Sequence, residues 1–445
     1  MNYLEIVNLV FSIVFGILGM LTMHFVFFTI IGIFFNKKFP ETEQKLKYGC
    51  IIPARNEELV IGNLIDSIRK NKYPQDKLDI YVIAHNCADR TAEYARRKGA
   101  IVYEYDNVNE KTKGYALKYL FDQIKNNHNI KQYDGFFIFD ADNILDEHYI
   151  KKMNAAFVSR NKKDVITSFR NSKNFGSNLM ATLYGLYFVY GCRLESRGRT
   201  VLGCSTRVSG TGYLFNSELV NDGWKYLTLT EDWELTVDQI LKDNKIVYCD
   251  EAVFYDEQPI SFSVMWKQRV RWAKGHLLVC VTKFAELTKS FFSSKKKQGG
   301  KNKFSIFDIS INIMPLCVIS TSITILQFIC VLIAPLFGIS IQEAYIPYLI
   351  NAGKNIVTAY IGLVFIFSLL YIIEHKRIKN VSLGKKIASV LLIPLFLFLS
   401  IPMEFVALFT KHVKWSSIPH VDTTSFGDLN DPNDSLYKTQ EIRIK

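Results

Sequence analysis

An apolar run without a single Asp, Glu, Lys or Arg occupies residues 9–35. A helix needs roughly 20 apolar residues to cross the hydrocarbon core of a bilayer, so this run is long enough to span one. It is too long for the core of a signal peptide, and no small-residue cleavage site follows it. Three more candidate spans lie near the C-terminus, at about residues 309–337, 356–373 and 387–410. We therefore expect a multi-pass membrane protein.

Basic residues cluster at the ends of these segments. Because Lys and Arg beside a span mark the cytoplasmic side, we expect the polar region of about residues 40–300 to be cytoplasmic and the protein to lie in the cell membrane. Much of the formal net charge of +12 lies in these clusters, which favours contact with anionic lipid over nucleic acid. Three C-terminal spans place the tail outside, unless residues 304–350 contain a re-entrant or interfacial helix. The clusters are Lys37, Lys38, Lys45 and Lys47; Lys295, Lys296, Lys297, Lys301 and Lys303; and Lys376, Arg377, Lys379, Lys385 and Lys386.

Glu404 lies inside the last candidate span, which also contains Pro394 and Pro402. A carboxylate is costly in lipid, so we expect it to face protein or a pore. A position near the membrane interface is the alternative.

The eight cysteines are scattered, with no Cys-x-x-Cys pair and no Cys/His cluster. This pattern indicates reduced thiols rather than a zinc site or a disulfide framework. Residues 293–303 form a Lys-, Gly- and Ser-rich segment that is typical of a flexible linker.

The polar region alternates between short apolar runs and segments of helical periodicity. The sequence predicts strands at 49–53, 80–84, 101–105 and 136–139, and helices at 59–69, 91–98 and 112–124. Such alternation favours a parallel sheet with helices on both faces. Ligands of these sheets bind beyond the carboxyl ends of the strands, so the polar residues at 54–57, 85–89 and 140–142 are the candidates.

Asp140 and Asp142 follow the predicted strand 136–139 directly. Two carboxylates at a strand exit are suited to a hard divalent cation that also binds diphosphate oxygens. The alternative is a surface turn, because Asp142 and Asn143 are good turn residues.

Glu231 and Asp232 stand at the start of a predicted helix over 232–241. An acid here is a candidate catalytic base. The structural alternative is an ordinary helix start, with Thr230 as the N-cap and acids in the first turn.

Gln268, Arg271 and Trp272 form a Gln-x-x-Arg-Trp motif. Residues three and four apart lie on one side of a helix, so the spacing groups an amide, a guanidinium and an indole. Arg suits a diphosphate and Trp offers a flat face to a sugar ring. An interfacial helix with a snorkelling Arg and a Trp anchor is the alternative.

Four motifs follow one another along the chain in a fixed order. They are residues 53–57, the pair Asp140 and Asp142, the pair Glu231 and Asp232, and the Gln-x-x-Arg-Trp motif. The chain resembles the membrane-embedded family 2 glycosyltransferases, which include cellulose, chitin, hyaluronan and poly-N-acetylglucosamine synthases. The resemblance covers about residues 48–285 and includes matching segments at 113–117 and 209–213. It implies an α/β fold with an A-type (Rossmann-like) glycosyltransferase domain and a mostly parallel sheet, joined to interfacial and transmembrane helices.

The resemblance also implies roles for individual residues. Asp232, beside Glu231, matches the general base, and Asp140 and Asp142 match the Mg²⁺ or Mn²⁺ site. The remaining implied contacts are Pro53, Arg55, Glu57, Asn86, Asp89 and Lys113 for the nucleotide-sugar, and Gln268, Arg271, Trp272, Gly210, Thr211 and Gly212 for the diphosphate and the acceptor.

One departure from the family pattern concerns the base of the nucleotide. Many members carry paired Asp after the second strand, where this chain has Ala84 and His85. Asn86 or Asp89 then remain to contact the base.

These inferences divide the chain into a first span with its basic flank (1–47), a cytosolic glycosyltransferase domain (48–258), interfacial helices and linker (259–303), transmembrane helices (304–410) and a polar tail (411–445). The predicted function is inverting, processive transfer from UDP-glucose or UDP-N-acetylglucosamine to a growing β-linked polysaccharide, exported through the spans with room for accessory subunits. The alternatives are a single transfer to a membrane lipid acceptor, as in ceramide glucosyltransferase-like proteins, and an inactive scaffold or sensor. Residues 415–420 of the tail are either a second sugar-facing patch or an interfacial belt.

Overall fold

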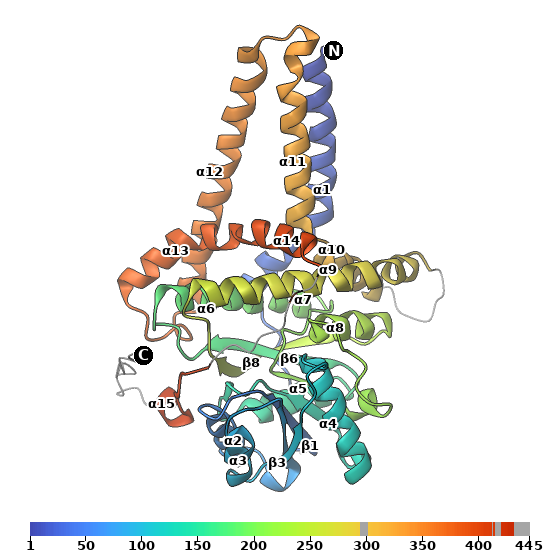
Figure 1. The fold of residues 1–445 in the computed structure, drawn as a ribbon, viewed down its shortest axis with the longest axis vertical. Coiled ribbons are helices and arrows are strands. Elements are labelled where there is room, and N and C mark those ends of the chain that lie inside the picture. The colour runs from blue at the N-terminus through green and yellow to red at the C-terminus, as the bar shows by residue number, and fades with distance from the viewer. Residues whose placement is uncertain (294–300, 412, 414–419, 431–445) are drawn as a thin grey trace.

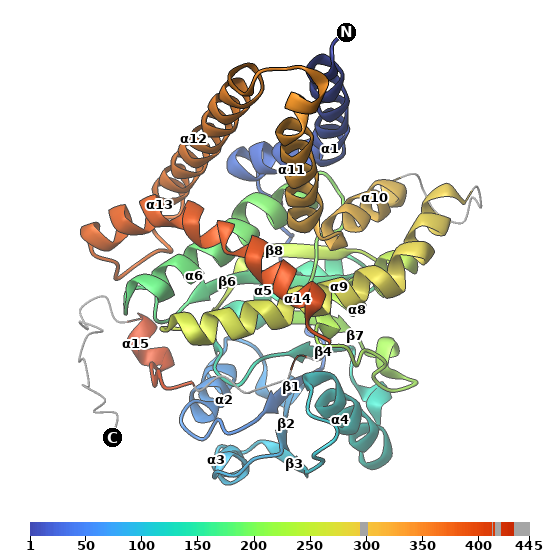
Figure 2. The ribbon, with the colours of Figure 1, turned by 45° about the horizontal axis from the view of Figure 1, so that its top comes forward.

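The computed structural model describes the whole chain except residues 294–300, 412, 414–419 and 431–445. Most of the predicted linker 293–303 and residues 415–419 of the tail patch lie outside the described residues. An α/β domain forms one end of the molecule, and helices α1, α11 and α12 extend from it side by side toward the other end (Figure 1). A layer of helices that run crosswise to these three lies between the two parts (Figures 1 and 2).

One mixed sheet of eight strands forms the centre of the α/β domain, in the order β3-β2-β1-β4-β7-β6-β8-β5. β1, β2, β3 and β4 pair in parallel, β6 and β8 pair in parallel, and β5 and β7 are antiparallel to their neighbours. The prediction of a mostly parallel sheet is therefore confirmed. The strands are β1 (Tyr48–Ala54), β2 (Leu78–His85), β3 (Ile101–Tyr105), β4 (Gly135–Ile138), β5 (Ile144–Leu145), β6 (Val165–Ser172), β7 (Tyr213–Asn216) and β8 (Ile246–Asp256).

Helices cover both faces of the sheet because each carries one apolar stripe. In α4 the buried residues include Leu117, Leu120, Phe121 and Ile124, which recur at helical spacing and pack on one face with Trp224. The opposite face is covered by α2, α3 and α5. The helices of this part are α2 (Ile61–Arg69), α3 (Thr91–Arg97), α4 (Lys113–Asn127), α5 (Tyr149–Ser159), α6 (Leu179–Tyr190), α7 (Arg197–Val201) and α8 (Glu231–Leu241), with a π-helical turn η3 (Gly191–Ser196) between α6 and α7.

Three helices of the described chain are long and apolar enough to cross a membrane: Tyr3–Phe34 (α1), Ile341–Ile373 (α12) and Leu383–Phe409. The segment predicted as one span at 309–337 is instead broken into α10 (Lys301–Ile313) and α11 (Leu316–Leu332), which are bent by 61°. Pro315 lies at the break, where it lacks the N–H that a continuous helix needs. A fourth span therefore requires that this bent pair be counted as one.

The last apolar segment also differs from a simple span. It divides into α13 (Leu383–Phe398) and α14 (Ser400–Phe409), which run crosswise to α1, α11 and α12 and along α9 (Phe262–Phe292) in Figure 1. Arg269 on α9 explains the close association, because its guanidinium donates to the Phe396 carbonyl (2.9 Å) and to Ser400 Oγ (2.6 Å) at the junction of α13 and α14.

Buried polar contacts attach the long apolar helices to the α/β domain. Arg377, after α12, binds Asp250 on β8 (3.0 Å). At α1, His24 contacts Asp308 on α10 (3.0 Å), and Asp308 also binds Arg199 on α7 (2.7 Å). Polar groups this buried are stable only when they have partners, so these contacts fix where the helices meet the domain.

The described part of the tail returns to the α/β domain. His420 contacts Glu57, and the carbonyl of Thr423 accepts a hydrogen bond from Asn63 on α2 (3.1 Å). The short helix α15 (Phe426–Asn430) packs on α2. The expectation placed the tail on the side opposite this domain, and these contacts correct it: residues 420–428 lie against the α/β domain.

Candidate active site

A cavity of about 530 Å³ lies between the carboxyl end of the sheet and helices α6 and α9. Because parallel strands end at the same edge, residues far apart in the sequence meet here. Ala54 ends β1, His85 ends β2 and Asp256 ends β8, and all three line the cavity together with Asp140 and Arg170. The sequence pattern predicted a ligand site at the carboxyl edge of the sheet, and the cavity lies at this edge.

Asp140 and Asp142 occupy the turn after β4, and both line the cavity. The backbone N–H of Asp140 donates to Thr211 Oγ1 (2.8 Å), and its carboxylate pairs with the Lys113 ammonium. Asp142 is 5% exposed and accepts hydrogen bonds from the Glu257 N–H (2.7 Å) and the Asn143 amide (3.2 Å). The turn is thus held from several sides with its carboxylates at the cavity wall.

The two carboxylates of this turn fit a divalent cation that takes most of its ligands from water and phosphate rather than from the protein. The described residues contain no group of three or more His, Cys, Asp or Glu arranged to hold a metal ion. Two carboxylates are nevertheless the usual protein share of a Mg²⁺ site whose other ligands are water and phosphate oxygens. Asp140 and Asp142 are the residues that would hold it.

Glu231 and Asp232 begin α8 and are almost fully buried. Burial raises the pKa of Glu231 to about 7 and also raises the pKa of Asp232, while the nearby Lys113 ammonium opposes both shifts. The Glu231 carboxylate lies 3.9 Å from Lys113 on the Asp140 side, whereas Asp232 hydrogen-bonds the backbone at Gly210. Both acids lie near Lys113, whose ammonium also donates to the Gly210 carbonyl (2.8 Å) and so joins the two sides.

The Gln-x-x-Arg-Trp motif lies on α9 with its three named side chains on the cavity side. Tyr184 donates a hydrogen bond to Gln268 Oε1 (2.6 Å), and Trp272 packs edge-on against Tyr184 and Phe188. Burial lowers the pKa of Arg271, with Glu231 and Asp232 as opposing charges. α9 approaches α8 closely because Gly275 lies against Thr230, where a Cβ would come within 2.3 Å of the threonine side chain.

The residues predicted to hold the nucleotide divide into two groups. Pro53, Arg55, Glu57 and Lys113 line the cavity. Asn86 and Asp89 are not among the lining residues. Asn86 instead pairs with the backbone of Asn107 (3.1 and 2.8 Å), and Asp89 accepts hydrogen bonds from Thr91 and from the Glu58 N–H. His85 takes the lining position at the end of β2, stacked on Tyr105.

The predicted acceptor loop divides in a similar way. Gly210 lines the cavity. Thr211 is buried and donates to Asn143 Oδ1 (2.6 Å), which supports the Asp140 turn. Gly212 has a φ of 66° and lies against the Phe254 ring, which leaves no room for a Cβ. Thr211 and Gly212 therefore shape the loop from behind, and Gly210 with Ser209 forms its surface.

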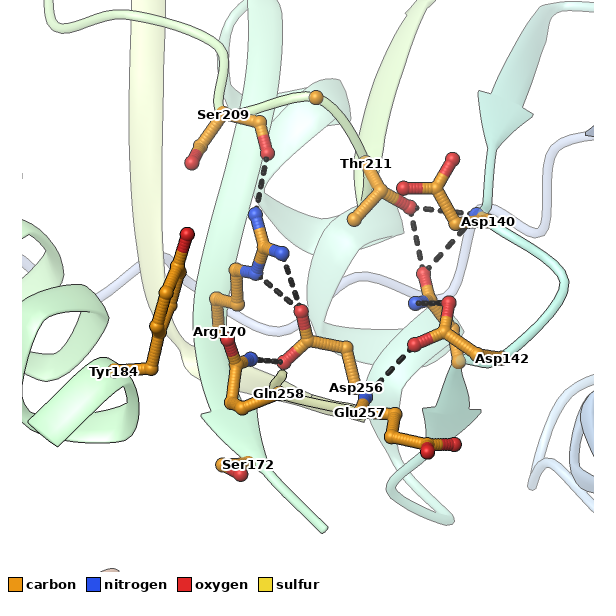
Figure 3. A network of polar contacts seen from close by, with 12 residues as sticks. Asp140, Asp142, Arg170, Ser172, Tyr184, Ser209, Thr211, Asp256, Glu257 and Gln258 are labelled. Carbon is orange, nitrogen blue, oxygen red and sulfur yellow. Dashed lines mark hydrogen bonds and ion pairs between the residues drawn. The ribbon is translucent and has the colours of Figure 1, made fainter. Parts of the chain in front are cut away.

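Arg170 is a site residue that the sequence analysis missed. It lies on β6, where it pairs with Asp256 and donates to the Ser209 carbonyl (3.2 Å; Figure 3). Its guanidinium also covers the Phe188 ring. Burial raises the pKa of Asp256 to about 7 despite the guanidinium beside it. Arg170 thus connects the acceptor loop to the Asp142 side of the sheet edge, because Glu257 follows Asp256 directly.

His420, the last residue of the predicted patch 415–420, also joins the site. Its Nδ1 lies 2.9 Å from a Glu57 oxygen, and the backbone N–H groups of Val421 and Asp422 donate to the Glu257 carboxylate (both 3.0 Å). Burial opposes the imidazolium, but the surrounding carboxylates of Asp142, Glu57 and Glu257 raise the pKa of His420 to about 10. Burial in turn raises the pKa of Glu57 to about 7. Within residues 415–420, only His420 belongs to the described part of the chain.

Comparison with known proteins gives a consistent result. The model of the family described as "Glycosyltransferase like family 2" matches residues 47–275, just over half of the chain. A probable glycosyltransferase of Bacillus subtilis, YdaM, is 23% identical over 279 residues, which are 59% of this chain and 63% of the relative. The poly-beta-1,6-N-acetyl-D-glucosamine synthase of Staphylococcus aureus strain COL is 27% identical over 252 residues, 55% of this chain and 57% of the relative.

Among solved structures, a mannosyltransferase from Pyrobaculum calidifontis, in complex with GDP-Man and Mn²⁺, shares the fold. Its TM-score is 0.56 at 14% identity, and the match covers 92% of this chain and 100% of that one. The chain spans somewhat over half the length of the curated relatives that it matches. The sheet, the motifs at its carboxyl edge and the matched family model agree: the chain belongs to glycosyltransferase-like family 2.

Proposed function

We propose that the protein is an inverting, processive membrane glycosyltransferase that extends a β-linked polysaccharide from a UDP-sugar. The observation that carries this proposal is the single cavity that joins Asp140 to Asp232 and to the Gln-x-x-Arg-Trp helix. Relatives named poly-beta-1,6-N-acetyl-D-glucosamine synthase favour UDP-N-acetylglucosamine over UDP-glucose as donor.

The chemistry follows from which side of the cavity each group faces. An acceptor hydroxyl beside Gly210 gives its proton to Asp232, whose raised pKa makes it a stronger base than an exposed carboxylate. The oxygen then attacks the anomeric carbon from the face opposite the diphosphate, which inverts the configuration. Arg271 and Lys113 are fixed cations for the negative charge that develops on the leaving diphosphate. A divalent cation at Asp140 and Asp142 would supply Lewis-acid stabilisation of the same charge.

The other polar groups hold these in place. Tyr184 fixes Gln268, and Gln268 precedes Arg271 by one helical turn. Arg170 holds the Ser209 carbonyl and so the loop on which the acceptor rests. Trp272 offers its ring to the acceptor sugar at the end of the cavity nearest α13 and α14.

The membrane helices give the proposed polymer its direction. With the basic clusters on the cytoplasmic side, the catalytic domain and residues 420–428 are cytoplasmic and the acceptor end of the cavity faces the bilayer. If the three candidate spans are too few to enclose a pore for the polymer, accessory subunits complete the export route.

The test uses membranes that contain the protein, supplied with Mg²⁺ or Mn²⁺ and a panel of radiolabelled UDP-sugars plus GDP-mannose. An Asp232→Asn variant is the matched control. High-mass, solvent-insoluble label from one UDP-sugar supports the proposal and identifies the sugar. Label confined to the lipid extract would overturn processive synthesis in favour of a single transfer to a membrane lipid. No label from any donor would indicate an inactive scaffold or sensor.

A further inference from the structure

Helix α12 carries a polar stripe in the middle of an otherwise apolar candidate span. The stripe consists of Asn351, Lys354, Asn355 and Thr358, whose spacing places them on one face of the helix. All four residues are exposed. In the part of the chain that the structure describes, none of their side chains has a hydrogen-bond or ion-pair partner.

The position of Lys354 along α12 places its ammonium well inside the hydrocarbon of a bilayer. At a rise of about 1.5 Å per residue, Lys354 lies about 20 Å from the start of α12 and about 29 Å from its end. The start of α12 is the end remote from the α/β domain (Figure 1), and large apolar side chains are exposed there, with Leu336 82% and Ile341 59% exposed. The hydrocarbon, about 30 Å thick, has to reach that end to cover them. A charge at the depth of Lys354 is costly in lipid and faces protein or water in membrane proteins.

The stripe continues the face with which α12 contacts α11. Tyr348, on this face, is stacked on Phe328 of α11 with ring centroids 5.7 Å apart. Below this contact α12 diverges from α11 (Figures 1 and 2), and Tyr360 then contacts α13 by donating to the Leu391 carbonyl (2.8 Å). The stripe therefore lies at a level of α12 where no described helix covers it.

The charge of the stripe selects what can cover it. Within the described residues of α1, α11 and α12, carboxylates stand only near helix ends, at Glu5, Glu343 and Glu374. Glu404 of α14 reaches the start of α11 instead. A second copy of this chain thus offers no carboxylate at the depth of Lys354, and an anionic lipid carries its charge at the membrane surface. A neutral sugar polymer offers hydroxyls but no compensating charge.

From this arrangement we propose that the polar stripe is the docking face for a transmembrane helix of a second protein, one with an Asp or Glu that pairs with Lys354 inside the membrane. The inference rests on the proposed function and deepens it, because it names the surface that an accessory subunit of the export route occupies. The amides and the hydroxyl of the stripe hydrogen-bond polar groups of the same helix. Gly362, one turn after Thr358, has no atom within 4 Å of the position of a Cβ, which leaves room for a close approach.

The test is photo-crosslinking in membranes of cells that make the protein naturally. A photoreactive benzoyl-phenylalanine at position 358 reports on the stripe. The same group at Ile356 is the matched control, because this residue is 62% exposed at nearly the same depth but on the opposite side of α12. Each probe is combined with Lys354→Leu, which removes the charge, and with Lys354→Arg, which keeps it. The crosslinked peptides are identified by mass spectrometry.

We expect the probe at position 358 to crosslink to an apolar segment of another protein that contains an Asp or Glu, with a yield about tenfold above that at Ile356. Lys354→Leu should lower this yield about tenfold, whereas Lys354→Arg should keep it within about twofold. Lys354→Glu should also lose the adduct, and replacement of the partner's acid by Lys should then restore it.

Several outcomes would overturn the docking face. These are no adduct, an adduct with a second copy of this chain, with sugar product or with lipid alone, and an adduct that Lys354→Leu leaves unchanged. Crosslinking needs no sugar transfer, so its result is independent of the donor assay. A wild-type enzyme that labels only lipid in that assay would overturn processive synthesis and leave the crosslinked partner in place.

Discussion

Under the proposed function the cavity has a donor end and an acceptor end, and these two ends are constructed differently. At the donor end, Asp140, Asp142 and Glu57 lie at strand exits, and each is held by hydrogen bonds or ion pairs to other parts of the sheet edge. At the acceptor end, helices α6 and α9 contribute mainly aromatic rings, with the π-helical turn η3 between α6 and α7. π-helical turns interrupt regular helices and occur frequently at functional sites.

This difference predicts different mutational behaviour. A hydrogen-bonded sheet edge presents fixed charges to a small, charged donor whose shape does not change between cycles. An aromatic surface binds sugar rings through their faces and tolerates successive positions of a chain. Changes at the donor end should therefore alter donor KM and donor hydrolysis, and changes at the acceptor end should alter acceptor use alone. Four experiments test this division.

The largest effect is expected at Asp232, where the two ends meet. Asp232→Asn removes the base and should lower transfer by a factor of ~10²–10⁴, the usual range for general-base catalysis. Binding of UDP should stay within about twofold, because Asp232 hydrogen-bonds the backbone at Gly210 and its proposed partner is the acceptor hydroxyl rather than the diphosphate. Transfer is measured with labelled donor and UDP binding by calorimetry, with Glu234→Gln on the same helix as control. Near-normal turnover in Asp232→Asn would remove Asp232 as the base.

Sequence patterns predicted the residues of this junction because each motif is local. The members of each motif lie within a few residues of each other, at a strand exit or on one helix. The motifs are Asp140 with Asp142, Glu231 with Asp232, and Gln268 with Trp272. The alternation of strands and helices also predicted their common edge, and the fold confirms it.

Contacts between residues far apart in the sequence could not be predicted in this way. His420 and Glu57 are 363 residues apart, and no local spacing indicates that they meet. Arg170 lies within a strand, where alternation suggests only an inward or outward side chain. One signal was present: Asp256, Glu257 and Gln258 follow β8 at the same edge as Asp140, and such a polar cluster after an apolar strand indicates a site. The broken helix at 313–316 lies in the stretch 304–350 that the sequence left open as a re-entrant or interfacial helix, because hydropathy reports apolar length and not direction.

Arg271→Lys should give the second largest effect. Lysine keeps the charge but not the planar fork that binds two diphosphate oxygens, so we expect kcat to fall by ~10²–10³, the scale for loss of one preorganised charge-stabilising group. Donor hydrolysis should fall with transfer, because both reactions expel the same diphosphate. Lys267→Ala, an exposed change on the same helix, is the control. Loss of transfer with intact hydrolysis would move Arg271 from the donor end to the acceptor end.

The pH dependence of kcat tests the buried acid pair at the junction. Burial raises the pKa of Asp232 above that of an exposed carboxylate and brings that of the neighbouring Glu231 to about 7, so the base becomes protonated at a higher pH than an exposed carboxylate does. We expect kcat to fall roughly tenfold for each pH unit on the acid side. The measurement is a pH profile of initial rates at saturating donor, with circular dichroism to exclude unfolding. An acid limb near pH 4 to 5 would mean that the acceptor or donor restores an ordinary carboxylate.

His420→Ala should have the smallest effect, and it tests the donor end alone. The variant removes the partner of Glu57 and a cation beside Asp142, so the carboxylates there repel the diphosphate more strongly. A charge-assisted hydrogen bond contributes ~1.5–3 kcal/mol, and solvent near the cavity mouth reduces this, so donor KM should rise about threefold to tenfold. Acceptor KM should stay constant, and Val421→Ala serves as the neighbouring control. A lower donor KM in His420→Ala would show the opposite, that residues 420–428 hold the donor end closed until the donor displaces them.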